Sequence, residues 1–391
     1  MKLLFFALTV MPIFISGSLN PETAAFPKGS KTIVYIGTFK GESSKGIYAW
    51  AFDSDSGKME PLGLSAAASR PLFLALHPNH RFLYAVSRPS PVDRQHIGVV
   101  IAYAIDSRSG ILTALNSLPS AGIDPAYLSV DQTGTNLLVA NFGSNSGQGN
   151  ASVFPIKQDG SLAEASDFVQ FSGTGVHPQR QQGPHSHAIN VSPDNRFVVV
   201  TDLGLDKLFV YRFDSGHGKL TPNKPAFAAL HPGAGPRHPV FHPSGRFVYV
   251  VNEIDSTITT FDYNTRAGAL RELQTVSTLP KDFAGANSAA EVQVHPNGKF
   301  LYASNRGNDS VVVFSIDTRV GTLTPLEWVQ TEGKTPGNFG IDPSGRWLLA
   351  ANQGSDSLVL FRLDPKTGRL QSTGQSFAVG TPSCVRFLPL K

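Results

Sequence analysis

Four side chains that can move protons or hold anions stand at matching places in three successive segments of the chain: His187, Arg237, Glu253 and Arg306. A histidine or a carboxylate can transfer a proton near neutral pH. Arginine guanidinium groups bind carboxylates, phosphates or a developing oxyanion. The combination therefore suits acid–base chemistry on a small anionic molecule, with His187 and Glu253 as proton-transfer groups and Arg237 and Arg306 as anion anchors.

A repeat along the chain makes these positions equivalent. An apolar run over residues 70–78, a turn and a second apolar run over 81–86 return around turns at Gly134, Asn195, Gly245, Gly298 and Gly345. The copies are spaced by roughly 47 to 61 residues, the length of a propeller blade. Each copy continues with two further short runs separated by turn residues, which predicts four antiparallel strands per copy.

The repeat predicts an all-β fold, a seven-bladed β-propeller of four-stranded antiparallel blades. Six copies are complete, while residues 32–39, 46–53 and 58–64 match only the second, third and fourth strands. Residues 381–387 match the first strand alone. Pairing this C-terminal strand with the N-terminal ones would complete a seventh blade and leave no open sheet edge. The propeller is accordingly expected over residues 32–391.

Two columns of the repeat carry the chemistry. The residue after Pro71, and after the position equivalent to Pro71 in the later copies, is, in order, Leu72, Ala126, His187, Arg237, Ala290, Gly337 and Ser383. The residue at the end of the second strand is Arg88, Phe142, Leu203, Glu253, Arg306 or Gln353, with Phe39 in the composite blade. A regular hairpin centred on Gly245 would place Arg237 opposite Glu253, so both columns should share one mouth of the tunnel.

Simpler roles exist for each residue alone. Arg237 and Glu253 could form only a cross-strand ion pair, His187 could be a structural histidine, and Arg306 could tie two blades. Their grouping on adjacent blades favours a functional site, and substrate contacts are predicted for Arg180, His185, Arg88 and Gln353. Residues 172–184, which precede His187, form a longer loop than their counterparts and would act either as a substrate clamp or as a surface insertion.

Other recurring polar residues are expected to be structural. His77, His242 and His295 precede the turn proline in several copies, and Asn141, Asn252, Asn305 and Asn352 end the second strands. No metal is predicted, because only His185 and His187 stand close enough on one element to share an ion. The single cysteine, Cys384, excludes an internal disulfide. No cofactor is expected.

Charge and the first residues bear on partners and location. The chain has 33 Lys and Arg against 29 Asp and Glu, a net charge of +4, without a basic run, so no nucleic-acid partner is expected. Residues 1–18 contain Lys2, an apolar stretch and Ser16-Gly17-Ser18, which predicts a signal peptide. Residues 19–31 would form a short N-terminal extension. The protein is expected to be periplasmic or secreted, with no stable membrane association after signal removal.

Several motifs resemble those of the propeller lactonase family. They are Tyr35-Ile36-Gly37-Thr38-Phe39, Arg180-Gln181 leading to Pro184-His185-Ser186-His187, Gly235-Pro236-Arg237-His238, Val251-Asn252-Glu253 and Ser304-Asn305-Arg306-Gly307. This family includes cycloisomerase-type bacterial 6-phosphogluconolactonase and the fungal carboxymuconate lactonizing enzyme. The resemblance covers nearly the whole chain after the signal segment.

The resemblance implies a metal-independent lactonase whose site contains His187, Arg237, Glu253 and Arg306. The implied substrate is a small anionic lactone, typically of a sugar acid, or a related carboxylate. The family members that act on sugar phosphates are cytosolic and differ from this chain in its signal segment. Phosphorylated and unphosphorylated lactones are therefore both candidate substrates. Carboxymuconate cyclase-like lactonization and non-catalytic binding of a ligand or protein by an exported propeller are the alternative functions.

Overall fold

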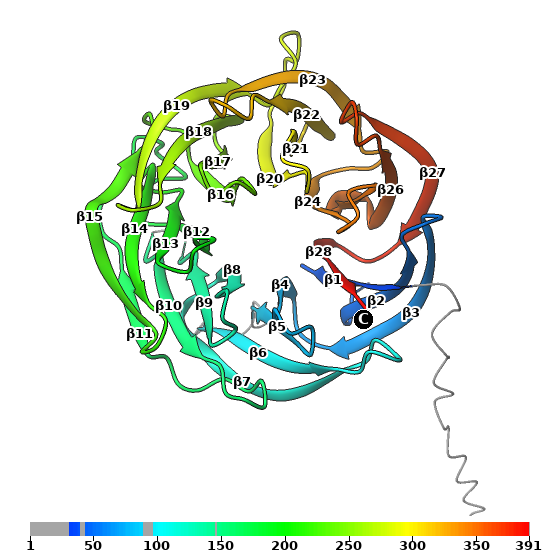
Figure 1. Cartoon of the computed structure of the whole chain (residues 1–391), viewed down its shortest axis with the longest axis horizontal. Coiled ribbons are helices and arrows are strands. Elements are labelled where there is room, and N and C mark those ends of the chain that lie inside the picture. The colour runs from blue at the N-terminus through cyan, green and yellow to red at the C-terminus, as the bar shows by residue number, and fades with distance from the viewer. Residues whose placement is uncertain (1–30, 40–43, 89–96, 145–146, 391) are drawn as a thin grey trace, which may run out of the picture.

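The computed structural model describes residues 31–39, 44–88, 97–144 and 147–390. These residues form seven four-stranded antiparallel sheets arranged as blades around a central tunnel (Figure 1). The predicted seven-bladed β-propeller is therefore confirmed. The predicted signal peptide, residues 1–18, lies outside the described residues. No helix in the described part of the chain is long and apolar enough to span a membrane.

Each blade contributes one strand to each of four concentric positions. The innermost strands, which border the tunnel, are β28 (Pro382–Pro389), β4 (Pro71–Leu76), β8 (Pro125–Val130), β12 (Ser186–Val191), β16 (Pro236–Phe241), β20 (Ser288–Val294) and β24 (Pro336–Ile341). The second strands are β1 (Thr32–Thr38), β5 (Phe82–Ser87), β9 (Asn136–Asn141), β13 (Phe197–Asp202), β17 (Phe247–Asn252), β21 (Phe300–Arg306) and β25 (Trp347–Asn352). The third strands are β2 (Gly46–Asp53), β6 (Ile97–Ile105), β10 (Asn150–Pro155), β14 (Lys207–Asp214), β18 (Thr257–Asn264), β22 (Ser310–Ile316) and β26 (Ser357–Leu363). The outermost strands are β3 (Lys58–Ala67), β7 (Leu112–Ile123), β11 (Asp167–Gln170), β15 (Lys219–Ala229), β19 (Ala269–Ser277), β23 (Leu323–Gln330) and β27 (Leu370–Ala378), and one 3₁₀ turn, η1, covers Gln353–Ser355.

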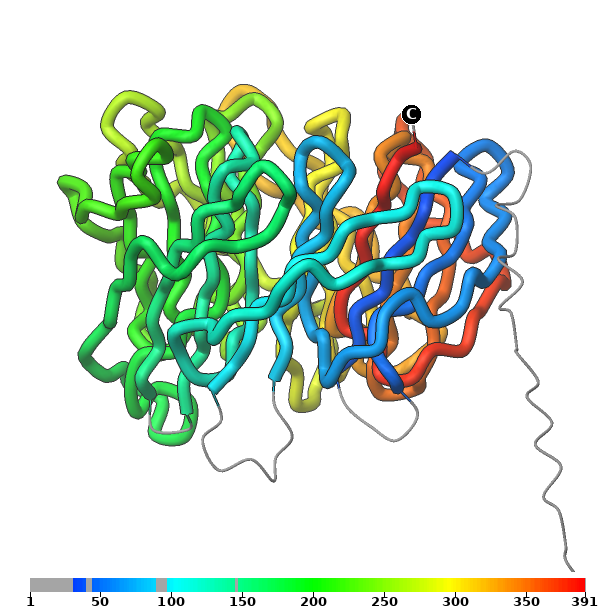
Figure 2. Tube along the Cα trace, turned by 90° about the horizontal axis from the view of Figure 1, so that it is seen from below, coloured from blue at the N-terminus to red at the C-terminus, as the bar shows by residue number. Residues whose placement is uncertain are grey.

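We call the blade made of β28, β1, β2 and β3 the closing blade, and number the others 1 to 6 in chain order from β4–β7 to β24–β27. In the closing blade, β1 pairs with β28 from Thr32 opposite Pro389 to Thr38 opposite Pro382. Figure 2 shows the two ends of the propeller, blue and red, running side by side. The predicted joining of the N-terminal and C-terminal strands is confirmed.

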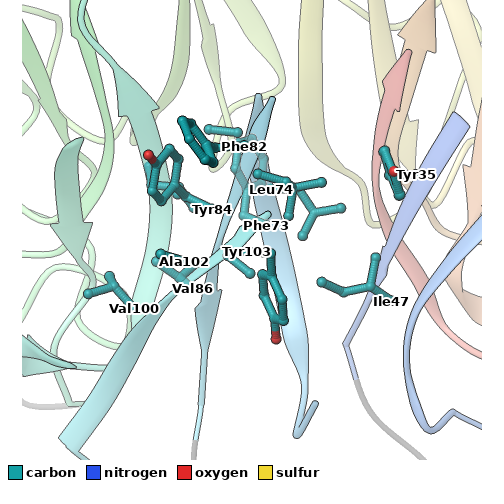
Figure 3. Close-up of a cluster of buried hydrophobic side chains, with 14 of the residues drawn as sticks. Tyr35, Ile47, Phe73, Leu74, Phe82, Tyr84, Val86, Val100, Ala102 and Tyr103 are labelled. Atoms are coloured by element: carbon teal, nitrogen blue, oxygen red, sulfur yellow. The ribbon is translucent and has the colours of Figure 1, made fainter. Parts of the chain in front are cut away.

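Burial follows the position of a strand in its blade. The second strands are buried on both faces, as in β17 with the sequence Phe-Val-Tyr-Val-Val-Asn, because each blade packs between two neighbours. Outer strands alternate between covered and exposed side chains, as in β27. This difference explains why the second strands are continuous apolar runs in the sequence. Figure 3 shows Tyr35 and Ile47 of the closing blade near Phe73, Leu74 and Tyr103 of blade 1, and these side chains belong to one core cluster.

The histidines before the turn prolines join neighbouring blades, as expected of structural residues. The Nε2 atoms of His77, His242 and His295 lie 2.8 Å from the carbonyl oxygens of Gly134, Gly298 and Gly345 in the next blade. Gly345 has φ of +71°, and a Cβ there would come within 2.6 Å of the His295 ring. Glycine is therefore required at this turn both by its backbone conformation and by the histidine packed on it.

The strand-end asparagines are structural as well. Three of them donate from Nδ2 to a backbone carbonyl: Asn141 to Ser120, Asn305 to Thr278 and Asn352 to Thr331. Asn252 instead donates to the side chains of Thr257 and Thr259. These bonds fix the end of the second strand next to the tunnel mouth.

The predicted register at the start of the inner strands is wrong. Instead of Arg237 facing Glu253, Pro236 pairs with Asn252 and His238 with Val251, so Arg237 is the extra residue of a β-bulge. The same irregularity leaves Leu72, Ala126, His187, Gly337 and Ser383 without a ladder partner in their blades. The column that carries the candidate chemistry is thus a ring of bulges, which re-aim side chains at the mouth of the tunnel.

Candidate active site

A pocket of about 380 Å³ opens at the mouth of the tunnel where the bulges lie. This volume is in the range typical of small-molecule sites. The lining comes from all seven blades and the loop before β12: Phe39, Leu72, Phe73, Arg88, Asp124, Ala126, Phe142, Gly143, Arg180, His187, Arg237, His238, Glu253, Arg306, Gly337, Gln353 and Ser383. The two repeat columns therefore meet in one pocket, which includes seven of the eight predicted site residues; the eighth, His185, is not part of the lining.

Three consecutive blades position the four central residues. His187 and Arg237 are the bulge residues of β12 and β16. Glu253 directly follows β17, and its N–H donates to the Gly235 carbonyl at 2.7 Å. Arg306 ends β21, where Nη2 donates to Ser288 Oγ at 2.5 Å. Backbone bonds and strand ends, rather than flexible loops, thus hold these side chains.

Glu253 is the common partner of three arginines. Its Oε2 lies 2.9 Å from Arg237 Nε and 2.8 Å from Arg306 Nη2, while Oε1 accepts a hydrogen bond from Arg180 Nη2. His187 Nε2 faces the same carboxylate at 3.8 Å. Glu253 is buried, Arg237 is largely covered, and both belong to a network across blades 3, 4 and 5, so they do not form an isolated exposed pair.

This arrangement sets the protonation states. Burial alone would raise the pKa of Glu253, but the charges of Arg306 and Arg237 hold it well below its ordinary value, so the carboxylate is ionised. Burial, together with the positive charge of Arg237, holds the pKa of His187 well below 6.5. His187 is therefore neutral at pH 7. Burial and Arg306 lower the pKa of Arg237 to about 10, which leaves it charged at neutral pH.

The centre of the pocket carries a net positive charge. Arg180, Arg237 and Arg306 contribute three positive charges, Glu253 contributes one negative charge, and His187 is neutral. Two positive charges are thus left without a carboxylate in this cluster. Because buried or partly buried charges favour oppositely charged partners, the pocket suits an anionic ligand or an oxyanion that forms during a reaction.

Arg180 reaches the site from the long loop before β12. The loop is anchored by Gln181, whose buried amide donates to Leu203 O at 2.9 Å and to Asp206 Oδ1 at 2.7 Å. Its Oε1 accepts from the N–H groups of Val176 and His177. The Arg180 side chain is 40 % exposed against 12 % for that of Arg237. The loop is therefore no loose surface insertion, since it sets a cation at the outer edge of the pocket.

His185 supports the pocket from outside its lining. Its ring stacks on Phe142 with centroids 4.4 Å apart, and Nδ1 lies 3.0 Å from the Phe142 carbonyl oxygen. Phe142 in turn contacts the edge of His187, with ring centroids 5.5 Å apart.

In the described residues no group of three or more His, Cys, Asp or Glu could hold a metal ion.

The opposite side of the pocket has a different character. Arg88 Nε lies 3.7 Å from Asp124 Oδ1, and its guanidinium carbon is 5.6 Å from the centre of the Phe39 ring. Burial lowers the pKa of Arg88. Gln353, at the start of η1, lines the pocket next to Gly337. This side combines an aromatic face with a locally neutralised cation, whereas the Glu253 side is strongly positive.

Sequence reasoning missed a second layer beneath these residues. His238 lines the pocket directly after Arg237, and Glu291 lies below it, with His238 Nδ1 3.4 Å from Glu291 Oε2. The repeat does contain a signal for both, since the position after the bulge column reads Phe73, Tyr127, Ala188, His238, Glu291, Asn338 and Cys384. The sequence comparison followed only the bulge column and the strand-end column, so this third column was not considered.

The fold and the pocket together define a β-propeller with a small-molecule site at one mouth of its tunnel. The family model described as "Lactonase, 7-bladed beta-propeller" matches residues 33–387. The chain belongs to this family, which confirms the resemblance found in its motifs.

Named relatives and solved structures agree with this membership. The chain is 38% identical to the 6-phosphogluconolactonase of Bacillus subtilis, over 92% of this chain and 99% of the relative. It is similar to the structure of a periplasmic gluconolactonase of Pseudomonas aeruginosa, with a TM-score of 0.86, 35% identity and coverage of 92% of this chain and 99% of that one. A putative 6-phosphogluconolactonase of Bacteroides fragilis gives a TM-score of 0.83 at 34% identity, covering 92% and 98%.

Proposed function

We propose that the protein is a lactonase that hydrolyses a sugar-acid lactone in the pocket at the tunnel mouth. The carrying observation is the cluster of three arginines around Glu253 with a neutral, buried histidine beside it. Family membership and relatives named as 6-phosphogluconolactonase or gluconolactonase support the same activity. Hydrolysis consumes a cyclic ester and water and releases an open-chain hydroxy acid.

Lactone opening places three demands on the site. Water must lose a proton as it attacks the carbonyl carbon, the oxyanion must be stabilised, and the ring oxygen must receive a proton as the C–O bond breaks. Neutral His187 meets the first demand, because an uncharged imidazole can accept a proton at pH 7. Its imidazolium form can then return that proton to the leaving oxygen.

The arginines meet the demand for charge stabilisation. Arg237 and Arg306 both line the pocket, and each guanidinium contacts Glu253. Glu253 is held ionised by these charges, and both of its oxygens are engaged by arginines, so its proposed part is to fix the arginines rather than to accept the water proton. Sugar lactones hydrolyse readily without a catalyst, so one general base and a set of arginines can supply the acceleration required.

The substrate class is an acidic or polyhydroxylated lactone. Two uncompensated positive charges in the pocket favour a substrate that carries a carboxylate or phosphate, or a product carboxylate. The aromatic and polar side formed by Phe39, Arg88 and Gln353 would contact the remainder of the sugar. Phosphorylated and unphosphorylated aldonolactones both match this chemistry.

A lactone panel with pH-stat detection tests the proposal. The purified protein is given phosphorylated and unphosphorylated aldonolactones, alongside Arg306→Ala and the control Arg319→Ala, whose side chain is 87 % exposed. We expect acid release with the wild type and the control, and at least a hundredfold loss of kcat in Arg306→Ala. Loss of ultraviolet absorbance from an unsaturated diacid without water uptake would instead identify a lactonizing enzyme, and ligand binding without any turnover would identify a binding propeller.

The site of action is proposed to be outside the cytoplasm, in the periplasm or in secreted form. The support is the signal-like sequence of residues 1–18 and the similarity to a periplasmic gluconolactonase. Cell fractionation with N-terminal sequencing of the mature protein tests this: a start near Leu19 is expected, and an intact Met1 in the cytoplasmic fraction would refute it.

A further inference from the structure

Asp206 connects the long loop before β12 to the segment before β16. The residue is buried, with 6 % of its surface exposed. Its Oδ1 accepts hydrogen bonds from Gln181 Nε2 at 2.7 Å and from Gly235 N at 2.8 Å, and its Oδ2 accepts one from Gly233 N at 2.7 Å. One carboxylate therefore satisfies donors from both segments and fixes the position of each relative to the other.

Both of the segments that Asp206 joins lead to Glu253. In the loop, Arg180 directly precedes Gln181 and donates from Nη2 to Glu253 Oε1. In the other segment, the Gly235 carbonyl oxygen accepts the Glu253 N–H at 2.7 Å. The bonds of Asp206 and the ion pair between Arg180 and Glu253 thus form a closed ring of contacts. The guanidinium and the carboxylate that it binds are both placed from Asp206.

The repeat separates a common role of this position from a special one. The residue directly before the third strand has a left-handed backbone in four blades, with φ of +52° at Asp206, +58° at Ser256, +54° at Asp309 and +50° at Asp356. Asp309 and Asp356 accept the N–H groups of Thr335 and Thr381, each at 2.7 Å, and so fix the segment that enters the next blade. In the described part of the chain, neither accepts a hydrogen bond from a glutamine or asparagine side chain. The bond from Gln181 therefore distinguishes Asp206.

Arg180 depends on its loop more than the other arginines of the site depend on theirs. Its side chain is 40 % exposed, against 12 % for Arg237 and 21 % for Arg306. Arg237 and Arg306 also donate to backbone carbonyl groups of β20. The Arg180 guanidinium forms no hydrogen bond except that to Glu253 among the residues that the structure describes. The loop backbone therefore determines where this cation lies.

We propose that Asp206 is a positioning residue: through Gln181 it holds Arg180 at the outer edge of the pocket, where Arg180 binds the anionic group of the lactone. This role rests on the proposed lactonase function. Asp206 is not part of the pocket lining and does not touch the reacting atoms. Because Arg237 and Arg306 have supports of their own, loss of the contact should weaken substrate binding, which raises KM, and leave kcat nearly unchanged.

Hydrogen exchange of the full-length protein measures the loop without any substrate. Gln181 Oε1 accepts two N–H groups of the loop, so these amides should be protected in the wild type. Asp206→Gly removes the carboxylate and suits the left-handed backbone. Exchange at residues 174–181 should become about tenfold faster or more. The matched variant Asp309→Gly should leave exchange in this loop within about twofold of the wild type. Unchanged loop exchange in a folded Asp206→Gly variant would overturn the proposal.

Kinetics on the lactone that the wild type turns over measure the role in binding. Asp206→Gly and Arg180→Ala should each raise KM about tenfold with kcat within about threefold. The double variant should have the KM of Arg180→Ala alone, because both changes break the same contact. Asp309→Gly should have the wild-type KM. Additive effects of the two changes, or a lower kcat with KM unchanged, would overturn the positioning role.

Gln181→Ala breaks the same contact from the loop side and leaves the bonds from Gly233 and Gly235 to Asp206 in place. It therefore decides the question if Asp206→Gly does not fold. Its KM should match that of Arg180→Ala, and a folded Gln181→Ala variant with the wild-type KM would overturn the proposal. Absence of any lactone turnover by the wild type would refute the proposed function instead, while the exchange experiment would still test the contact.

Discussion

Arg306 Nη2 lies 2.8 Å from Glu253 Oε2, although Arg306 ends the second strand of blade 5 and Glu253 directly follows the second strand of blade 4. The contact therefore spans the interface between blades 4 and 5 at the tunnel mouth. It makes the site a property of the ring rather than of any single blade, because Arg306 of blade 5 finds its carboxylate partner in blade 4.

Replacing Glu253 by Gln should destabilise the protein strongly at neutral pH. Three arginines would lose their shared counter-charge in a buried setting, which costs about 3–5 kcal/mol. The carboxylate has a depressed pKa in the folded state, so its contribution is fully present above its unfolded pKa of about 4.5 and is lost as pH falls further.

Urea unfolding of the wild type and Glu253→Gln from pH 7 to pH 3 measures this difference. The gap in unfolding free energy should be constant from pH 7 to pH 5 and narrow below. A gap that widens on acidification would contradict the depressed pKa. Glu327→Gln, whose carboxylate pairs with Arg369 on the surface, should change stability by less than about 1 kcal/mol.

His187→Ala should abolish most of the lactonase activity while leaving the fold intact. Loss of a positioned general base lowers rates by about 10²–10⁴-fold. Buried His187 Nδ1 has no hydrogen-bond partner among the described residues, so removing the ring breaks no bond at that atom. Activity on the accepted lactone and the melting temperature are the two measurements, and a variant that retains more than half of the wild-type kcat would remove His187 from the mechanism.

His295→Ala should have the reverse effect. The ring nitrogen Nε2 lies 2.8 Å from the Gly345 carbonyl oxygen of the next blade, the ring packs beside Phe300, and His295 is not part of the pocket lining. Loss of the buried bond and the ring should destabilise the protein by about 2–4 kcal/mol with kcat unchanged. Thermal unfolding and kinetics on one preparation check both halves, and a large loss of activity in a folded variant would contradict the division between scaffold and site.

Deleting residues 382–391 should destabilise the entire ring. The strand β28 buries Cys384, Val385, Phe387 and Leu388, and its loss would also expose the edge of β1. At about 1.5–3 kcal/mol for each buried side chain, the loss exceeds about 6 kcal/mol. Calorimetry of the truncated protein, with deletion of Lys391 alone as control, measures it; a truncated form that melts like the full-length protein would contradict closure of the ring by β28.

Much of the fold and part of the site follow from the repeat. A blade period places one residue of each copy at the same height in the tunnel. Comparing copies therefore singles out His187 among mostly small or apolar counterparts, and Arg306 in a column that also contains Arg88, Glu253 and Gln353. The same comparison identified His77 and Asn305 as scaffold, because these types recur in blade after blade. The closing blade could be predicted because the N-terminal copy lacks its first strand and the C-terminal segment matches only a first strand.

The rest of the site depends on β-bulges and loop contacts, which the sequence pattern of a regular strand does not reveal. A regular strand would turn Arg237 and His238 to opposite faces, whereas the bulge lets both line the pocket. The hydrogen bonds of Gln181 anchor the loop that brings Arg180 to Glu253. These bonds join segments that have no counterpart in the repeat. The buried pair of His238 and Glu291 was missed because the column that contains it was not considered, and His185 was assigned to the pocket although its ring is engaged by Phe142.

The pairing of β28 with β1, which closes the ring, also determines when the pocket forms during folding. Thr32 and Pro389 are opposite each other in the finished sheet but 357 residues apart in sequence, a contact that requires closure of a very large loop. Contacts of this range form late and slow the folding of β-rich proteins. Until then the pocket lacks the wall that contains Ser383 and Phe39. Catalytic competence should therefore appear in a single late kinetic phase, together with the final strand pairing.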